Sequence, residues 1–183
     1  MKILFATGNP GKLREVKALF AGMGHEVEQL DDDCPEIQAD TLEEVVAAAL
    51  DWLWERHHVP VMIDDSGLFI DALKGFPGVY SAYALKTLGC PGMLKLMEGI
   101  GNRGAEFRCC AGFVDSGGRM TTRSGVSRGS IIGEMRGSDG FGFDPIFMPD
   151  GFDQTFAELE LRVKNTISHR GRAFESMAEA MKE

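Results

Sequence analysis

Residues 2–12 read KILFATGNPGK: an apolar segment ends in a Thr-Gly-Asn turn, and Lys12 follows one turn later. After Lys2 the apolar part does not alternate with polar residues, which is typical of a strand covered on both faces. From Leu13 the hydrophobic period becomes that of a helix, and Gly22 and Gly24 provide its stop. A strand, a tight turn and a helix in this order predict an α/β fold, in which helices pack over a parallel or mixed sheet.

The turn itself has a composition that suits an anion. Thr7, Gly8 and Asn9 stand at the start of the helix, where free backbone N–H groups and the positive end of the helix dipole favour a group such as phosphate. Gly8 allows close approach and Lys12 adds a positive charge. A Walker A loop is absent. An ordinary strand-to-helix turn with a solvated lysine explains this stretch equally well.

Composition and charge limit the class of protein. The 183 residues, 44% of them hydrophobic, suffice for one well-buried core, so we expect a single domain over residues 1–183. Lys plus Arg number 19 against 28 Asp plus Glu, and a formal charge of -9 disfavours a nucleic acid polymer as partner. No leader and no apolar segment near the roughly 20 residues of a membrane span is present. We therefore expect a soluble, cytoplasmic protein without a membrane partner.

The rest of the chain continues the alternation of strands and helices. The four cysteines lack C-x-x-C spacing, so we expect reduced thiols rather than a zinc site, with the neighbours Cys109 and Cys110 on opposite faces of a strand. We expect a strand at 26–30 and then a helix capped by Thr41 and Glu44, whose buried stripe is Leu42, Val45, Val46, Ala49 and Leu53. A buried strand from Pro60 follows and turns at Ser66-Gly67. The later elements are a hairpin at 116–118 and a last helix capped near Ser168.

Two carboxylates, Asp64 and Asp65, end the apolar run of that buried strand. Carboxylates there are costly unless they bind a cation, accept several hydrogen bonds or face a cleft, and a Mg²⁺ site fits. Neighbouring strand residues point to opposite faces, so the two do not both serve one ion, and capping of the following turn is open to Asp64. Glu36, in an acidic loop, is by itself more typical of a solvated carboxylate.

The segment DGFGFDPIF, residues 139–147, places Phe141 and Phe143 two residues apart. In an extended chain both rings would lie on one side, where they could stack on a planar base, although packing in the core is the commoner fate of Phe. Asp144, held extended by Pro145, could accept hydrogen bonds from a base or sugar.

Three possible cations, Lys164, His169 and Arg170, surround the start of the last helix. Cations beside a helix N-terminus favour an anion or an electron-rich base edge. Solvated surface charge is the everyday alternative.

The order of these motifs resembles that of the inosine triphosphate pyrophosphatase family, also called Ham1-like proteins or XTP/dITP diphosphatases. The resemblance runs from about residue 3 to about residue 175 and is closest to the archaeal members. The motifs that carry it are Thr7-Gly8-Asn9-x-x-Lys12, Pro35-Glu36, Asp64-Asp65-Ser66-Gly67-Leu68, Phe76-Pro77-Gly78, Phe141-Gly142-Phe143-Asp144-Pro145 and Ser168-His169-Arg170.

The resemblance implies a long mixed twisted sheet flanked by helices, in two lobes with the substrate cleft between them, and a homodimer. It implies Mg²⁺-dependent hydrolysis of ITP, dITP and XTP to the nucleoside monophosphate and pyrophosphate, which cleanses the nucleotide pool. The implied roles are phosphate binding by Thr7, Gly8, Asn9 and Lys12; Mg²⁺ binding by Glu36 and Asp65, with Asp65 also the general base and Ser66 beside the substrate; and enclosure of the base and sugar by Phe141, Gly142, Phe143, Asp144, Lys164, His169 and Arg170.

One position departs from the family pattern. The helix after the metal loop usually carries a lysine directed at the phosphates, and the position aligned with it is Asp51. Either this alignment is wrong by a turn, or Lys12 or Lys86 compensates, or activity is reduced. Selectivity over ATP would follow from donors that face a 6-keto oxygen, for which His169 and Arg170 are candidates.

Two other functions remain open. A nucleotide-binding regulatory module would keep the pocket without turnover, and a metal-dependent nuclease or phosphodiesterase would use the same carboxylates on a polymer, which the net charge disfavours. An NAD-type oxidoreductase is a poorer match, because G-x-G-x-x-G does not follow the first strand.

Overall fold

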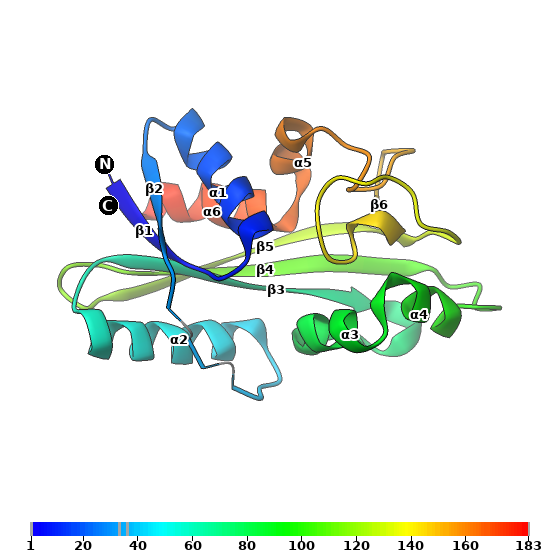
Figure 1. Cartoon of the computed structure of the whole chain (residues 1–183), viewed down its shortest axis with the longest axis horizontal. Helices are drawn as coiled ribbons and strands as arrows, with labels where there is room; N and C mark the ends of the chain where they lie inside the picture. The colour runs from blue at the N-terminus through cyan, green and yellow to red at the C-terminus, as the bar shows by residue number, and fades with distance from the viewer. Residues whose placement is uncertain (1, 33, 36, 183) are drawn as a thin grey trace.

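The computed structural model describes residues 2–32, 34–35 and 37–182, in which strands and helices alternate as far as β3 and then follow in pairs (Figure 1). The strands are β1 (Lys2–Ala6), β2 (Glu26–Leu30), β3 (Val61–Ile70), β4 (Gly104–Val114), β5 (Met120–Ile131) and β6 (Phe147–Pro149). The α-helices are α1 (Pro10–Gly22), α2 (Leu42–His57), α3 (Ser81–Thr87), α4 (Gly89–Leu96), α5 (Leu161–Ile167) and α6 (His169–Ala180), and the 3-10 helices are η1 (Asp71–Leu73), η2 (Gly78–Tyr80) and η3 (Asp144–Ile146).

The strands form one mixed sheet over the described residues, in the order β2-β1-β3-β4-β5-β6. β1 pairs in parallel with β2 and β3, whereas β3–β4, β4–β5 and β5–β6 are antiparallel. Helices α1, α5 and α6 lie on one face, and α2, α3 and α4 lie on the other (Figure 1). The α/β fold with a mixed sheet between helices is therefore confirmed. None of the described helices has the length and apolar character needed to cross a membrane.

Apolar side chains gather at both ends of the sheet and define two lobes. In the first lobe, α1 and α6 pack on one face of the sheet around Phe5, Phe20 and Phe174, whose rings meet edge to face with centroids 5.6 and 5.9 Å apart. Helix α2 packs on the opposite face around Leu50. The second lobe has its own core at the far ends of β3 to β5, which includes Phe107. Because β3, β4 and β5 run through both cores, the lobes share one continuous sheet.

The helix starts follow from their capping residues. Asn9 caps α1 and Pro10 occupies the first turn, where its missing N–H costs nothing. Thr41 and Glu44 form the predicted capping box of α2, and Ser168 Oγ accepts from the Gly171 N–H at the start of α6. The predicted hairpin joins β4 to β5, and the predicted strand at 26–30 is β2.

The expected turn at Ser66-Gly67 is wrong, because β3 continues to Ile70 and pairs with β4 along its whole length. Gly67 has a different purpose: the carbonyl oxygen of Gly78 packs against it so closely that a Cβ would collide with it. The glycine therefore marks a close approach between β3 and η2 rather than a chain reversal.

The two adjacent cysteines of β4 behave as predicted. Cys109 is buried in the core beneath α1 and α6, and Cys110 is buried in the core beneath α2. The alternation of side chains along β4 thus places the two thiols on opposite faces of the sheet.

Candidate active site

A cavity of about 400 Å³ lies where the two lobes meet, a volume typical of small-molecule sites, which run from about 300 to 1,000 Å³. Its walls come from the β1–α1 turn, the middle of β3, the inner face of α2, the 141–144 segment and the start of α6. The predicted residues that line it are Thr7, Gly8, Asn9, Lys12, Asp65, Ser66, Phe141, Gly142, Phe143, Asp144, His169 and Arg170.

Of the predicted site residues that the structure describes, one does not line this cavity. Lys164 lies behind the cavity wall, with its side chain 3% exposed. Glu36, the other predicted metal ligand, lies outside the described residues. Its role remains a prediction.

The β1–α1 turn is more self-contained than the sequence suggests. Asn9 Oδ1 accepts hydrogen bonds from the backbone N–H groups of Gly11 at 2.8 Å and Lys12 at 3.2 Å, and Asn9 N–H donates to Thr7 Oγ1 at 3.1 Å. The expectation of free N–H groups at this helix start is therefore wrong for Gly11 and Lys12. The helix dipole and the Lys12 side chain still favour an anion at this end of the cavity.

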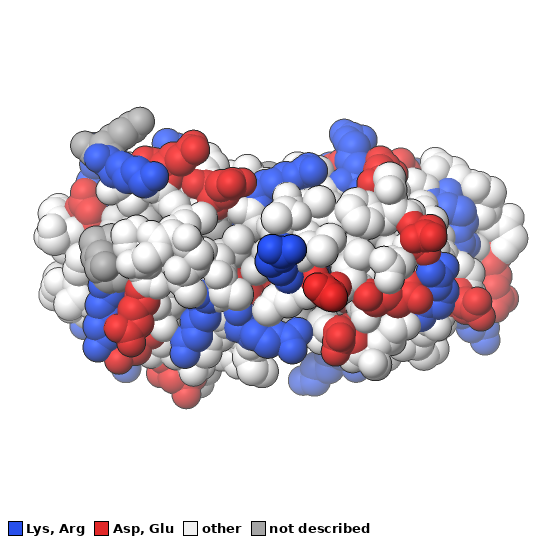
Figure 2. Space-filling view, turned by 90° about the horizontal axis from the view of Figure 1, so that it is seen from above, with Lys and Arg blue, Asp and Glu red and all other residues white. Residues whose placement is uncertain are grey.

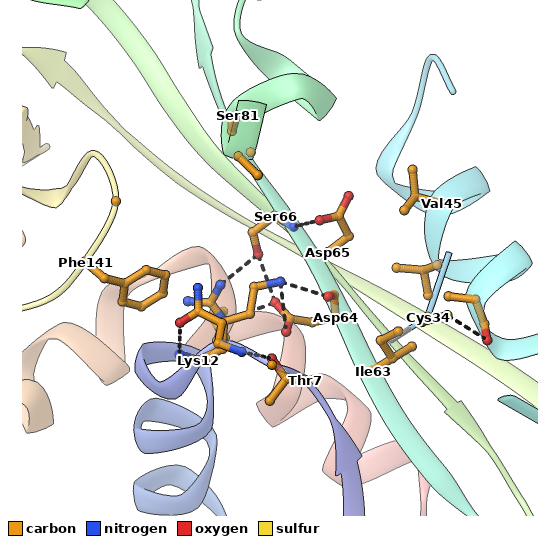
Figure 3. A pocket seen from close by; sticks show the side chains of 18 of the residues that line it. Thr7, Lys12, Cys34, Val45, Ile63, Asp64, Asp65, Ser66, Ser81 and Phe141 are labelled. Carbon is orange, nitrogen blue, oxygen red and sulfur yellow. Dashed lines mark hydrogen bonds and ion pairs between the residues drawn. The ribbon is translucent and has the colours of Figure 1, made fainter. Parts of the chain in front are cut away.

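The Asp64–Asp65 pair splits across the sheet as the strand period requires (Figure 3). Asp65 lines the cavity from β3, and its Oδ1 accepts from the Ser66 N–H at 2.9 Å. Asp64 is buried, and its Oδ2 accepts from Ser66 Oγ at 3.0 Å and from Arg170 Nε at 3.1 Å. Asp64 therefore does not cap a turn; both carboxylates border the cavity, but Asp64 is buried and paired, whereas Asp65 is partly exposed.

Six charged side chains form an alternating buried network, here called the charged cluster. Its members in order are Lys12, Asp64, Arg170, Glu15, Lys164 and Asp144. Glu15 stands at its centre, since its carboxylate accepts from Arg170 Nη1 and from Lys164 Nζ, each at 2.6 Å. Three cations face three carboxylates, so the cluster carries no net charge.

The pKa values in the charged cluster follow from burial and from these pairs. Burial raises the pKa of Glu15 and of Asp64, but the cations beside them more than offset it, so both pKa values lie below those of ordinary carboxyls. Burial raises the pKa of Asp144, and Lys164 does not fully compensate. The Arg170 pKa is raised because Asp64 and Glu15 outweigh burial, and this guanidinium stays charged.

The expectation that Lys164, His169 and Arg170 jointly offer positive charge is wrong. Lys164 and Arg170 are neutralised by their carboxylate partners within the charged cluster. Burial lowers the pKa of His169 well below its usual value, and the cations Arg170, Lys164 and Lys12 lower it further. His169 is therefore a neutral imidazole, which stacks on Phe107 with ring centroids 4.7 Å apart.

The 141–144 segment is folded rather than extended, so the two rings do not share one side. Gly140 and Gly142 have φ values of 75° and 65°, and Asp144 begins η3. Phe143 lies in the core of the second lobe, whereas Phe141 faces the cavity, with the Lys164 ammonium 5.2 Å from its ring centroid. Core packing is thus confirmed for Phe143, and stacking on a base stays a prediction for Phe141.

Asp144 stabilises this folded segment from inside. Its Oδ2 accepts from the Phe141 N–H at 2.8 Å and from Lys164 Nζ at 2.6 Å. That oxygen is therefore engaged by the protein itself rather than held extended towards a ligand.

Helix α2 contributes an apolar wall to the cavity. Val45, Val46 and Ala49 line it, together with Ile63 of β3. Asp51 is exposed and does not line the cavity, so its carboxylate does not face the place proposed for the phosphates. Lys86 is likewise exposed and outside the lining. Within the described residues, α2 brings no cation to the cavity.

Glu15 is a central member of the charged cluster that the sequence motifs did not single out. Its side chain is 1% exposed. A usable signal was present: Glu15 follows Lys12 by three residues, so both point to the same side of the helix. A lysine that is turned inward predicts that the carboxylate one turn later is turned inward too.

Comparisons with known proteins agree on one family. A sequence model of the Ham1 family matches residues 3–180. The chain is 52% identical over 183 residues to the dITP/XTP pyrophosphatase of Thermococcus kodakarensis, covering 100% of this chain and 98% of that protein, and 53% identical over 179 residues to the protein of the same name from Methanopyrus kandleri, covering 98% and 95%. The solved Ham1 protein of Staphylococcus aureus superposes with a TM-score of 0.84 at 30% identity, covering 100% of this chain and 98% of that chain.

Proposed function

This chain belongs to the Ham1 family, and on that premise we propose that it is a dITP/XTP pyrophosphatase. It hydrolyses deaminated purine nucleoside triphosphates, ITP, dITP and XTP, to the nucleoside monophosphate and pyrophosphate. The proposal rests on sequence identities of 52% and 53% to proteins of that name over nearly the full chain. The cavity supports it, because residues from four separate segments with the expected motifs line it.

The chemistry needs alignment and charge stabilisation more than a covalent nucleophile. Asp65 faces the cavity and is the group that takes a proton from the attacking water. Lys12 and the start of α1 hold the phosphates. No Ser-His-Asp or Cys-His arrangement is needed.

The donor set also suits Mg²⁺. This ion is usually held by one or two carboxylates together with substrate phosphates and waters, and the Asp65 carboxylate on the cavity wall fits that pattern. Within the described residues no group of three or more His, Cys, Asp or Glu side chains could hold a metal by itself. Mg²⁺, held by Asp65 and the predicted Glu36, would supply charge neutralisation at the phosphates.

Selectivity for a 6-keto purine is assigned to His169 and nearby backbone amides. All three nitrogens of the Arg170 guanidinium already donate within the protein, Nε to Asp64, Nη1 to Glu15 and Nη2 to Ser66. His169, by contrast, is a neutral imidazole on the cavity wall with one N–H to donate, and its Nδ1 is buried without a protein partner in the described structure. A 6-amino group would place donor against donor, which disfavours ATP.

The protein is further proposed to act as a single-domain homodimer in the cytoplasm, on small nucleotides rather than polymers. The long strands β3 to β5 support one domain. Tyr83, Tyr80 and Phe76 are 69%, 46% and 40% exposed on one segment, which suits a protein interface. Within the described residues the four cysteines form no disulfide bond, which suits a reducing compartment. Acidic and basic side chains intermingle on the face in Figure 2, unlike the broad basic surface of a polymer-binding protein.

The test is to offer ATP, GTP, ITP and XTP with and without Mg²⁺, and to measure pyrophosphate and orthophosphate separately. We expect pyrophosphate from ITP and XTP only with Mg²⁺, and a loss of about 10²- to 10⁴-fold in turnover for Asp65→Asn. Asp51→Asn is the matched control, because it makes the same chemical change on the exposed face of α2.

Each rival function has its own outcome in this experiment. A regulatory module would release no pyrophosphate from any nucleotide. A phosphodiesterase would favour a polymer, which a salt-titrated DNA-binding assay detects. Comparable turnover of ATP, orthophosphate as the primary product or an unimpaired Asp65→Asn variant would contradict the proposal.

A further inference from the structure

Lys12 is held from two directions by one residue. Its Nζ donates to the main-chain carbonyl oxygen of Asp64 at 3.0 Å and lies 3.4 Å from the same residue's Oδ1 (Figure 3). The Lys12 side chain is 17% exposed, so the ammonium borders the cavity and is still fixed on its protein side. An ammonium has three donors, and two directions are taken by Asp64.

The orientation of Asp64 is itself fixed by its other oxygen. Oδ2 accepts from Ser66 Oγ at 3.0 Å, from Arg170 Nε at 3.1 Å and from Cys109 Sγ at 3.6 Å. Rotation of the carboxylate would break these contacts inside a region that excludes water, so Oδ1 stays directed at Lys12. Within the described residues, Oδ1 has no hydrogen-bond donor of its own and only this ion pair.

We propose that Asp64 is a positioning residue for Lys12: it holds the ammonium at the edge of the cavity where the triphosphate binds, and it does not ligate the metal. The inference rests on the proposed function, because it takes Lys12 as the phosphate-binding cation. The two aspartates then have different roles on the two sides of β3: Asp65 faces the substrate, and Asp64 holds Lys12 (Figure 3).

A simple electrostatic argument makes the sign of the effect decisive. A buried carboxylate so close to bound phosphates repels them, so its removal alone should tighten the binding of an anion. If Asp64 serves to position Lys12, its removal should instead weaken binding, because the ammonium loses both its counter-charge and its fixed direction. The two explanations predict opposite changes in one measurement.

The experiment is calorimetric titration of the full chain with inorganic triphosphate in buffer containing EDTA, which isolates the phosphate end from base and metal. We expect Lys12→Ala to weaken binding about tenfold, the scale of one charge-assisted hydrogen bond. Asp64→Asn, which keeps the size of the side chain, should weaken binding on the order of fivefold. The double variant should bind no more weakly than Lys12→Ala, because Asp64 acts through Lys12.

A general loss of structure would not reproduce this pattern, since two independent defects would add in the double variant. Unchanged or tighter binding by Asp64→Asn, or additive losses, would overturn the positioning role and leave the proposed function intact. If inorganic triphosphate fails to bind the native protein, or binds Lys12→Ala equally well, the assignment of Lys12 fails, and the proposal with it.

A charge-conserving variant covers the case in which Asp64→Asn does not fold. Lys12→Arg keeps the positive charge, but a planar guanidinium cannot direct its donors at the Asp64 carbonyl and carboxylate as an ammonium does. We expect it to bind inorganic triphosphate on the order of fivefold more weakly than the native protein. Full retention of affinity would show that the positive charge suffices and that Asp64 does not position it.

Discussion

The two sides of the cavity differ in how they use charge. The charged cluster brings three cations and three carboxylates together, and Lys164, Glu15 and Arg170 within it are almost fully buried. The apolar wall opposite, Val45, Val46, Ala49 and Ile63, offers shape without charge. The number of cations in the sequence therefore overstates the positive charge available to a ligand, because Lys164 and Arg170 neutralise protein carboxylates. A triphosphate would be bound by Lys12, the start of α1 and a metal.

The largest expected effect comes from breaking the charged cluster at its centre. Glu15→Gln removes the carboxylate shared by Lys164 and Arg170 and leaves two buried cations each short of a partner. Loss of one member of such a buried pair costs about 3–5 kcal/mol in the free energy of unfolding. Urea denaturation at neutral pH measures it.

The matched change on the other side is Val46→Ala, which shortens a fully buried side chain of the apolar wall. We expect a loss of about 2 kcal/mol in the free energy of unfolding, from lost burial and the small cavity left behind. Should Glu15→Gln cost less than Val46→Ala, the charged cluster would not be the more critical side of the cavity for stability.

A smaller effect concerns pH and tests the neutrality of His169. Its pKa lies well below 6.5 in the folded protein, so below pH 6.5 the unfolded chain binds a proton that the folded chain does not. The stability from this group is complete above that pH and is lost as the pH falls towards the folded pKa, by about 1.4 kcal/mol per pH unit. His169→Phe, whose ring can stack on Phe107, should remove that slope from the free energy of unfolding.

The measurement is urea denaturation at several pH values between 6.5 and 5, on the native protein and on His169→Phe. His58→Asn is the control, because it removes an exposed imidazole from a position with φ of 51° that Asn tolerates. An equal slope in the native protein and His169→Phe would mean that His169 is protonated in the fold and that its assignment as a neutral base donor is wrong.

Local rules explain which parts of this site could be predicted from sequence. The helix caps at Asn9, Thr41 and Ser168 depend on neighbours within about four residues, and the sequence contains both partners. The opposite directions of Asp64 and Asp65 follow from the strand period alone. The helical period in turn predicts that Asp51 points away from the cavity, because two residues beyond the buried Ala49 the helix has turned by about 200°.

What the sequence could not show is how distant charges pair. Glu15 contacts Lys164 and Arg170, which lie 149 and 155 residues away along the sequence, and no local sequence pattern predicts those contacts. The folded form of the 141–144 segment depends on Asp144, whose own place is set by Lys164. Predicted cations therefore became internal partners, because burial makes an unpaired charge too costly to keep.

The smallest expected effect comes from adding charge to the apolar wall. Ala49→Lys places an ammonium on the α2 side of the cavity, where the described structure has only uncharged side chains from this helix. A second cation near the phosphates should tighten the binding of inorganic triphosphate about fivefold, the scale of one additional charge-assisted contact in a partly hydrated site. Calorimetric titration in the same EDTA buffer measures it.

The matched control is Ala47→Lys, which adds the same charge to the exposed face of α2, two residues away and on the far side of the helix. A general electrostatic effect of one more lysine would raise the affinity of both variants alike and would fade with added salt. A gain confined to Ala49→Lys would show that the apolar wall borders the phosphates. Equal affinities for Ala49→Lys and the native protein would place the triphosphate nearer the charged cluster and away from α2.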